Sequence, residues 1–203
     1  NPITIGSGAI SAQYSVFSDQ TGIISISGGA LSYLLIRDEA NGGGSAVGAV
    51  NMTTDESLIL YAAGYDTDNN YLSDIDGNWS VTGSLDGIAS SGISIEFSPS
   101  TSSTSGTIVV SSTGVTSDAT GTVTVGTGVL DQIIIRDGSG GSGSEVETLS
   151  LTTDETHAMY MAGDDQDNNY IRDVNVLWTV QGDIGTISTG TSYSSSTIFT
   201  ATM

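Results

Sequence analysis

The chain carries one cluster of aspartate and asparagine residues twice, as "DTDNNYLSDID" from Asp66 and "DQDNNYIRDVN" from Asp165. Carboxylate and amide oxygens at alternate positions are ligands for a hard cation such as calcium. The same residue types also build tight turns, because their side chains accept hydrogen bonds from nearby backbone N–H groups. Both chemistries are therefore open for the two clusters.

The calcium interpretation resembles the start of an EF-hand loop, with oxygen ligands at positions one, three, five and nine and a backbone carbonyl near Leu72. The sequence departs from that loop, because position six is Tyr71 or Tyr170 instead of Gly and position twelve holds no Glu. We expect either a plain turn between two strands or a looser calcium site. The ligands of that site would be Asp66, Asp68, Asn70 and Asp74 in the first cluster and Asp165, Asp167, Asn169 and Asp173 in the second.

The elements that must position these clusters are short strands. Apolar residues alternate with polar ones in runs such as Ile93, Ile95 and Phe97, and the runs are bounded by Gly, Ser and Asp. Alternation with a period of two is typical of half-buried strands, and many short strands are typical of a β-sandwich. Long helical patterns are missing, so the sequence predicts an all-β chain.

The sequence also repeats itself at an offset of 99 residues. "LLIRD" at 34–38 matches "IIIRD" at 133–137, and "MTTDE" at 52–56 matches "LTTDE" at 151–155. Many matches at one offset indicate two copies of one domain of about immunoglobulin size.

The offset extends outside the two obvious copies, because "TGIISISGGAL" from Thr21 matches "TGTVTVGTGVL" from Thr120. The N-terminal stretch thus corresponds to the closing strands of a repeat. The second copy stops shortly after "TIFTAT" and lacks counterparts of 108–110 and 123–125. We therefore expect donor-type closing strands at 1–29, a complete domain at 30–128 and an incomplete domain at 129–203.

The runs "LYAAGYDTDNNYLSDIDGNWSVTG" from Leu60 and "MYMAGDDQDNNYIRDVNVLWTVQG" from Met159 resemble bacterial Ig-like repeats of large surface proteins. In that family an apolar strand, an Asp/Gly/Asn turn and a strand with a core Trp follow one another. The resemblance implies tandem Ig-like β-sandwich domains at the cell surface or outside the cell, used as spacer, adhesin or filament modules. Trp79 and Trp178 are then core residues. The disulfide of antibody domains is absent, since the chain has no Cys.

Composition excludes several classes of function. The net charge of -20 repels nucleic acid and anionic membrane surfaces, and no apolar run is long enough for membrane insertion. Thiol and amine nucleophiles are absent, because the chain has no Cys and no Lys. The carboxylates recur in both copies, which favours a structural role, so we expect no enzymatic activity. Asn51 and Asn78 fit the N-glycosylation pattern.

Taken together, these features predict a structural subunit of an extracellular filament, a head-to-tail homopolymer. Ala9 and Ile10 in one strand, and Ile24 and Ile26 in another, would complete the second domain of a neighbouring copy by β-augmentation. One alternative is a fragment of a long tandem-repeat surface adhesin, whose neighbouring repeats complete the ends covalently. Another is a carbohydrate-binding accessory module, which would need an exposed aromatic platform.

Overall fold

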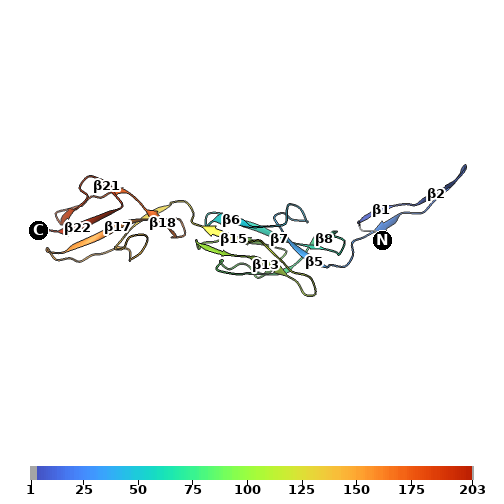
Figure 1. Ribbon diagram of the computed structural model, residues 1–203, viewed down its shortest axis with the longest axis horizontal. Coiled ribbons are helices and arrows are strands. Elements are labelled where there is room, and N and C mark those ends of the chain that lie inside the picture. Colours follow the sequence, from blue (N-terminus) through green and yellow to red (C-terminus); the bar gives the residue numbers. More distant parts are fainter. Residues whose placement is uncertain (1–3, 203) are drawn as a thin grey trace. The chain divides into compact units, whose positions relative to one another are not determined.

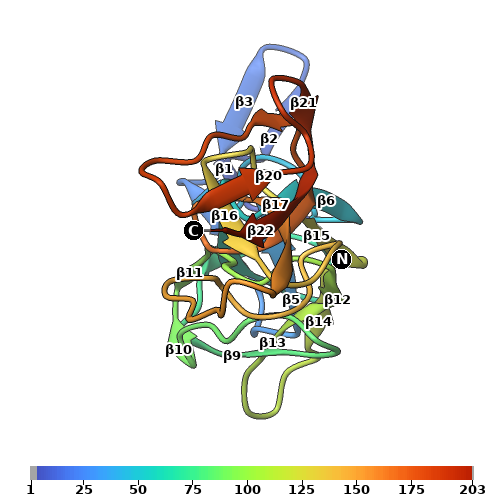
Figure 2. The same ribbon diagram turned by 90° about the vertical axis from the view of Figure 1, so that its left-hand side faces the viewer.

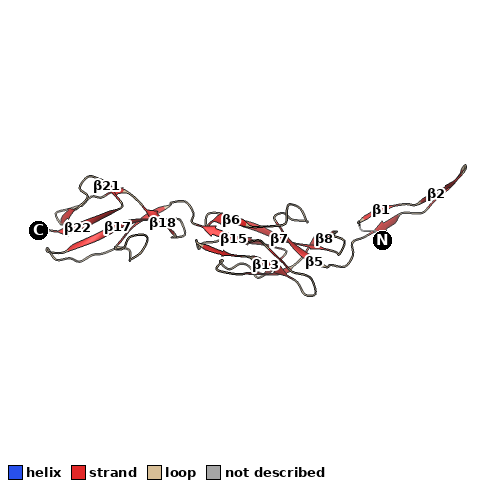
Figure 3. Ribbon diagram, viewed as in Figure 1, coloured by secondary structure: helices blue, strands red, loops and turns tan. Residues whose placement is uncertain are grey.

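The computed structural model describes residues 4–202, and every regular element in this range is a β-strand (Figures 1 and 3). Antiparallel pairing predominates in its sheets, for example between β5 (Tyr33–Arg37) and β7 (Leu58–Tyr65). The prediction of an all-β chain is confirmed. Within the described range no helix has the length and apolar character that crossing a membrane requires.

The chain divides into two compact units. Unit 1 holds the described residues up to Met52 together with Glu56–Ser98 and Thr104–Thr124. Unit 2 holds Thr53–Asp55, Pro99–Ser103 and the described residues from Val125 onward. Two internal segments of the first repeat, together with its last residues from Val125 onward, therefore belong to unit 2.

The N-terminal segment and the first repeat contain three larger sheets and two hairpin-like pairs. The sheets have the strand orders β11-β7-β5, with β8 on β7, then β10-β9-β13-β14, and β12-β15-β6, while β1 pairs with β4 and β2 with β3. The strands are β1 (Gly6–Gly8), β2 (Ser11–Tyr14), β3 (Phe17–Gln20), β4 (Ile24–Ile26), β5 (Tyr33–Arg37), β6 (Val50–Thr53), β7 (Leu58–Tyr65), β8 (Tyr71–Asp74), β9 (Gly77–Val81), β10 (Ser91–Gly92), β11 (Ser94–Phe97), β12 (Thr104–Gly106), β13 (Ile108–Ser111), β14 (Asp118–Ala119) and β15 (Val123–Gly126).

The core of the first repeat follows from the alternation in its strands. Leu34 and Ile36 in β5 are buried while their neighbours are less so, and Ile95 and Phe97 in β11 show the same alternation. Successive side chains of a strand point to opposite faces, so one apolar residue in two enters the core. The core Trp prediction is also confirmed, because Trp79 is buried and its indole N–H donates to the carbonyl oxygen of Gly92 at 2.8 Å.

The second repeat forms the same strand pairs where its sequence matches the first. Ile133 lies opposite Gly163, as Leu34 lies opposite Gly64 at the offset of 99 residues. Figures 1 and 2 show β17 and β22 next to each other in the sheet of order β16-β17-β22-β20, with β18 on β17, and a separate pair is β19-β21. These strands are β16 (Gln132–Arg136), β17 (Thr156–Asp164), β18 (Tyr170–Asp173), β19 (Val176–Leu177), β20 (Gly185–Ile187), β21 (Tyr193–Ser194) and β22 (Ser196–Ala201).

Candidate assembly interface

An open apolar groove of about 800 Å³ lies in the second repeat, inside unit 2. In the first repeat the residues that match Ile135, Met159 and Phe199 are completely buried. In the second repeat all three are only half-buried, and Leu149 is exposed. The side chains that line the groove include Ile135, Leu149, Leu151, Met159, Trp178 and Phe199. At the offset of 99 residues the first five match Ile36, Val50, Met52, Leu60 and Trp79. Phe199 matches Phe97 through the strand register, because Phe199 lies opposite His157 as Phe97 lies opposite Leu58.

In the first repeat, two strands cover the side chains that correspond to the groove. Ile108 and Val110 in β13, and Val123 and Val125 in β15, are at most 1% exposed. β13 pairs with β9, so that Val110 lies opposite Trp79, and β15 lies between β12 and β6. In the second repeat the described residues contain no counterpart of either strand. The groove therefore lies where β13 and β15 pack in the first repeat.

The backbone around the groove also lacks strand partners. β9 extends over Gly77–Val81, whereas its counterpart β19 covers only Val176–Leu177. The residues that match β6, at 149–152, are not a strand at all. A strand needs hydrogen bonds from a neighbour, and an unpaired edge is a template for a further strand. The second repeat thus offers both an apolar groove and backbone groups ready for pairing.

The N-terminal strands have the complementary property. β1 pairs only with β4 and β2 only with β3 among the described strands, and nearly all side chains of these pairs are exposed. Ile10 is 65% exposed and Ile24 is 41% exposed, whereas Ile26 is half-buried. Exposed apolar side chains gathered on two isolated strand pairs are typical of an interaction surface.

The hydrogen bonds of this segment repeat those of the first repeat. Thr21 donates its backbone N–H to the Ile10 oxygen at 2.9 Å, and Thr120 donates to the Ile108 oxygen at the same distance. In both places the Thr hydroxyl accepts from the backbone N–H of that isoleucine. Ala12 lies opposite Asp19 as Val110 lies opposite Asp118.

These bonds change one detail of the sequence alignment. The constant offset of 99 residues places Ala9 on Ile108, whereas the hydrogen bonds make Ile10 the counterpart of Ile108. The reason is a shorter connection, since the stretch from Ile10 to Thr21 has one residue fewer than the stretch from Ile108 to Thr120. Ala9 and Ile10 themselves lie between β1 and β2, while Ile24 and Ile26 are the ends of β4.

The first Asp/Asn cluster forms a tight turn around a buried carboxylate. Asp66 is only 2% exposed, and its Oδ1 accepts the backbone N–H groups of Asp68 and Asn70, both at 2.9 Å. Its Oδ2 accepts the Gly29 N–H and the Asn70 side-chain amide, again at 2.9 Å. Asn69 has a φ of 65°, a left-handed conformation that asparagine tolerates in turns.

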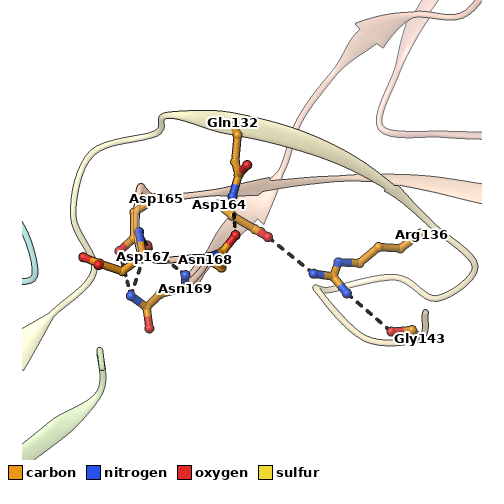
Figure 4. A network of polar contacts seen from close by, with 8 residues as sticks. All are labelled: Gln132, Arg136, Gly143, Asp164, Asp165, Asp167, Asn168 and Asn169. Carbon is orange, nitrogen blue, oxygen red and sulfur yellow. Dashed lines mark hydrogen bonds and ion pairs between the residues drawn. The ribbon is translucent and has the colours of Figure 1, made fainter. Parts of the chain in front are cut away.

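The second cluster repeats this geometry in unit 2, as Figure 4 shows for the Asn169 amide and Asp165. The Asp165 Oδ1 accepts the N–H groups of Asp167 at 3.1 Å and Asn169 at 2.8 Å. Its Oδ2 accepts the Gly128 N–H at 3.0 Å and the Thr54 hydroxyl at 2.8 Å. Three of these four contacts come from backbone N–H groups, as the turn interpretation expects, and the fourth comes from the Thr54 side chain.

The remaining carboxylates of the calcium set lie in other contacts. Asp74 Oδ2 accepts the Asn41 N–H at 2.9 Å, and Asp173 Oδ1 accepts the Gly140 N–H at 3.2 Å. Asp68 is exposed. Within residues 4–202 the structure contains no group of three or more acidic, His or Cys side chains arranged to hold a metal ion. Calcium binding at the two turns stays a prediction.

Chelation tests that prediction directly. If the turns hold calcium, removing it with a chelator lowers the melting temperature, because a ligand that binds only the folded state stabilises that state. Asp68→Ala and Asp167→Ala would then each abolish the shift in their own repeat. Identical melting curves with calcium and with chelator would leave plain turns as the account of both clusters.

The two buried carboxylates predict a loss of stability in acid. Hydrogen bonds, first that from the Gly29 N–H and then that from the Asn70 side chain, lower the pKa of Asp66 from 3.8 to about 2. Burial alone would raise the pKa of Asp165, but the bonds from Gly128, Asn169 and Thr54 outweigh it and lower this pKa to about 2 as well. A depressed folded-state pKa stabilises the fold above the unfolded value and not below the folded one.

We therefore expect the melting temperature to fall as the pH drops from about 4 to about 2. Between about pH 5 and 8 the stabilisation from these groups is fully present, and they add no dependence on pH. Asp165→Asn should flatten that decline in unit 2, because the amide does not titrate. Asp167→Asn, at an exposed position, should leave the decline in place. A wild-type melting temperature that stays constant down to pH 2 would contradict the assignment.

The remaining candidate residues are two exposed asparagines, a buried tryptophan and an arginine in an ion pair. Asn51 in β6 and Asn78 in β9 are both exposed, and their glycosylation stays a prediction. Trp178 is buried like Trp79, and its indole N–H donates to the Ser194 oxygen at 3.0 Å. Arg136 forms an ion pair with Asp164 at 3.4 Å and also donates to the Gly143 oxygen, as Figure 4 shows.

No protein-family model, curated protein or solved structure matches this chain. The resemblance to bacterial Ig-like repeats stays a prediction that rests on the two quoted runs.

Proposed function

We propose that this protein is a structural subunit of an extracellular filament, in which Ig-like domains assemble head-to-tail by strand donation. The main support for this proposal is the match between the groove of the second repeat and the N-terminal strands of the described chain. The second repeat leaves a groove where the first repeat has β13 and β15, and the N-terminal strands reproduce the hydrogen bonds of that part of the first repeat. A second copy of this chain is therefore the occupant that fits.

The side chains account for the affinity. Ile10, Ile24 and Ile26 would take the places of Ile108, Val123 and Val125, which are buried in the first repeat. Burying one large aliphatic side chain contributes about 1.5 to 3 kcal/mol. The inserted backbone would also satisfy N–H and C=O groups along 149–152 and 178–180, which is the mode of binding called β-augmentation.

One carboxylate would fix the register. In the first repeat the Asp118 Oδ2 accepts the backbone N–H of Ile36 at 2.7 Å. Asp19 is the counterpart of Asp118, and Ile135 that of Ile36. The donated Asp19 would accept the Ile135 N–H of the neighbouring copy. A slip by one residue would lose this bond and turn each apolar side chain to the wrong face.

The symmetry of this contact favours a fibre. Each copy presents a donor and a groove on different parts of its surface, so the contact is head-to-tail and propagates without closing on itself. The location outside the cell is part of the proposal, supported by the resemblance to surface repeats. In the tandem-repeat adhesin alternative, the following repeat of the same polypeptide would fill the groove.

Engineered disulfides test the proposal, since the chain has no cysteine of its own. Ser11 corresponds to Val109, which lies opposite Ser80, and Ser80 corresponds to Thr179. Under oxidation, the Ser11→Cys/Thr179→Cys variant should form a ladder of covalent multimers on a non-reducing gel. The matched Ser80→Cys/Val109→Cys variant should cross-link within one chain. If the Ser80→Cys/Val109→Cys disulfide forms but the Ser11→Cys/Thr179→Cys variant gives only monomers, strand donation is rejected and the adhesin alternative is favoured.

A further inference from the structure

The Asp165 turn of unit 2 is held by residues that come from the first repeat of the sequence. The Thr54 hydroxyl donates to Asp165 Oδ2 at 2.8 Å. Next to it, the Val129 N–H donates to Asp55 Oδ2 at 2.7 Å. Thr54, only 6% exposed, and Asp55 directly follow β6, and Val129 follows the strand β15 that pairs with β6.

The Asp66 turn of unit 1 has the counterpart of the Gly128 contact but no counterpart of the Thr54 contact. The Gly29 N–H donates to Asp66 Oδ2 at 2.9 Å, as the Gly128 N–H donates to Asp165 Oδ2 at 3.0 Å. The residues that match Thr54 and Asp55 are Thr153 and Asp154, and both are exposed in the second repeat. No described contact of Asp66 takes the place of the Thr54 hydroxyl.

We propose that Thr153 and Asp154 of one copy hold the Asp66 turn of the next copy, with the Thr153 hydroxyl donating to Asp66 Oδ2 and Asp154 accepting the Ala30 N–H. This inference rests on the proposed strand donation. It adds a second, polar contact at the edge of the groove, where Thr153 is one of the lining residues and Asp154 lies just beyond it.

The path of the chain brings these groups together once β4 is donated. In the first repeat β15 pairs with β6, and both strands lead to the Asp165 turn, one through Gly128 and the other through Thr54. A donated β4 would lie beside 149–152 of the neighbour. The residues that follow β4, as far as Gly29, would then lie next to Thr153 of the neighbour. Asp66 would lie there too, because the Gly29 N–H donates a hydrogen bond to it.

This contact has a functional consequence for the fibre. The donor strands alone would be joined to their own unit through a single chain connection near Gly29. Hydrogen bonds from the neighbour to both Asp66 and Ala30 would fix the direction in which the next unit continues. The turn that the sequence repeats would thus be a joint between copies as well as within one chain.

A second pair of cysteines tests the contact separately from strand donation. Ala30→Cys/Asp154→Cys should give covalent multimers from oxidised fibres, and its matched control is Asp55→Cys/Val129→Cys, which should close within one chain. Multimers from both Ser11→Cys/Thr179→Cys and Ala30→Cys/Asp154→Cys support the inference. Multimers from the groove pair alone, with the matched control closed, overturn the inference and leave strand donation intact. Monomers from the groove pair overturn both.

Electron cryo-microscopy of the wild-type fibres decides the same question without any cross-link. The expected map places the Thr153 hydroxyl within hydrogen-bonding distance of the Asp66 carboxylate of the next copy. A map with β4 in the groove but Thr153 in solvent would overturn the inference.

Discussion

Deletion of residues 1–29 is expected to abolish fibre formation and to leave the second repeat prone to aggregation. The deletion removes the side chains of Ile10, Ile24 and Ile26, each of which contributes about 1.5 to 3 kcal/mol when buried. Without a donor, the groove of about 800 Å³ and its unpaired backbone stay open to solvent. Electron microscopy and sedimentation of the deleted protein beside the full chain measure the loss of fibres.

Two controls separate the donor strands from a general loss of folding. A synthetic peptide of residues 1–29, added to the deleted protein, should raise the melting temperature of unit 2 and suppress aggregation. In the full chain, Ile26→Asp should prevent assembly, whereas Ser25→Asp, which changes an exposed neighbour, should allow it. Fibres from the deleted protein, or equal assembly of the two point variants, would contradict strand donation.

Asp165→Ala is expected to destabilise unit 2 by roughly 2 to 4 kcal/mol, because a buried carboxylate that accepts several donors is lost. The Gly128 and Asn169 N–H groups and the Thr54 hydroxyl would lose their acceptor. A donor left without a partner in a buried place costs more than a hydrogen bond contributes when formed. Urea unfolding, monitored through the signal of Trp178 in unit 2, measures the change in the free energy of unfolding.

Asp167→Ala is the matched control, because Asp167 is exposed and its backbone N–H, which the substitution keeps, makes the turn contact. Its effect should stay within about 0.5 kcal/mol. Asp165→Asn should lie between the two, since the amide retains one acceptor oxygen in place of two. Equal stability of the Asp165→Ala and Asp167→Ala proteins would show that the buried carboxylate does not hold the turn.

The alternating apolar residues were sufficient to predict strands, and the resemblance to bacterial Ig-like repeats implied the burial of Trp79 and Trp178 that the structure shows. The tight turns were also predictable, because aspartate and asparagine bond to backbone groups only two to four residues away, as Asp66 does with Asp68 and Asn70. Local periodicity and local hydrogen bonds can be recognised in a sequence because both partners lie within a few residues of each other.

Contacts between distant residues could not be predicted in this way. The bond from Gly29 to Asp66, and that from Thr54 to Asp165, join residues far apart in the sequence. The correct counterpart of Ile108 also required the structure, because the shorter connection after Ile10 shifts the alignment by one residue. Register depends on paired backbone groups, which side-chain types alone do not specify.

The sequence by itself determined that this is an all-β chain with two matching repeats and two matching acidic turns. Only the tertiary structure decided which of the matching segments are strands. "VNMT" at 50–53 is strand β6, whereas the matching "LSLT" at 149–152 is not a strand, although its apolar residues are placed alike. The physical reason is that the hydrogen bonds of a strand come from its neighbour, and β15 lies beside the first segment while no described strand lies beside the second.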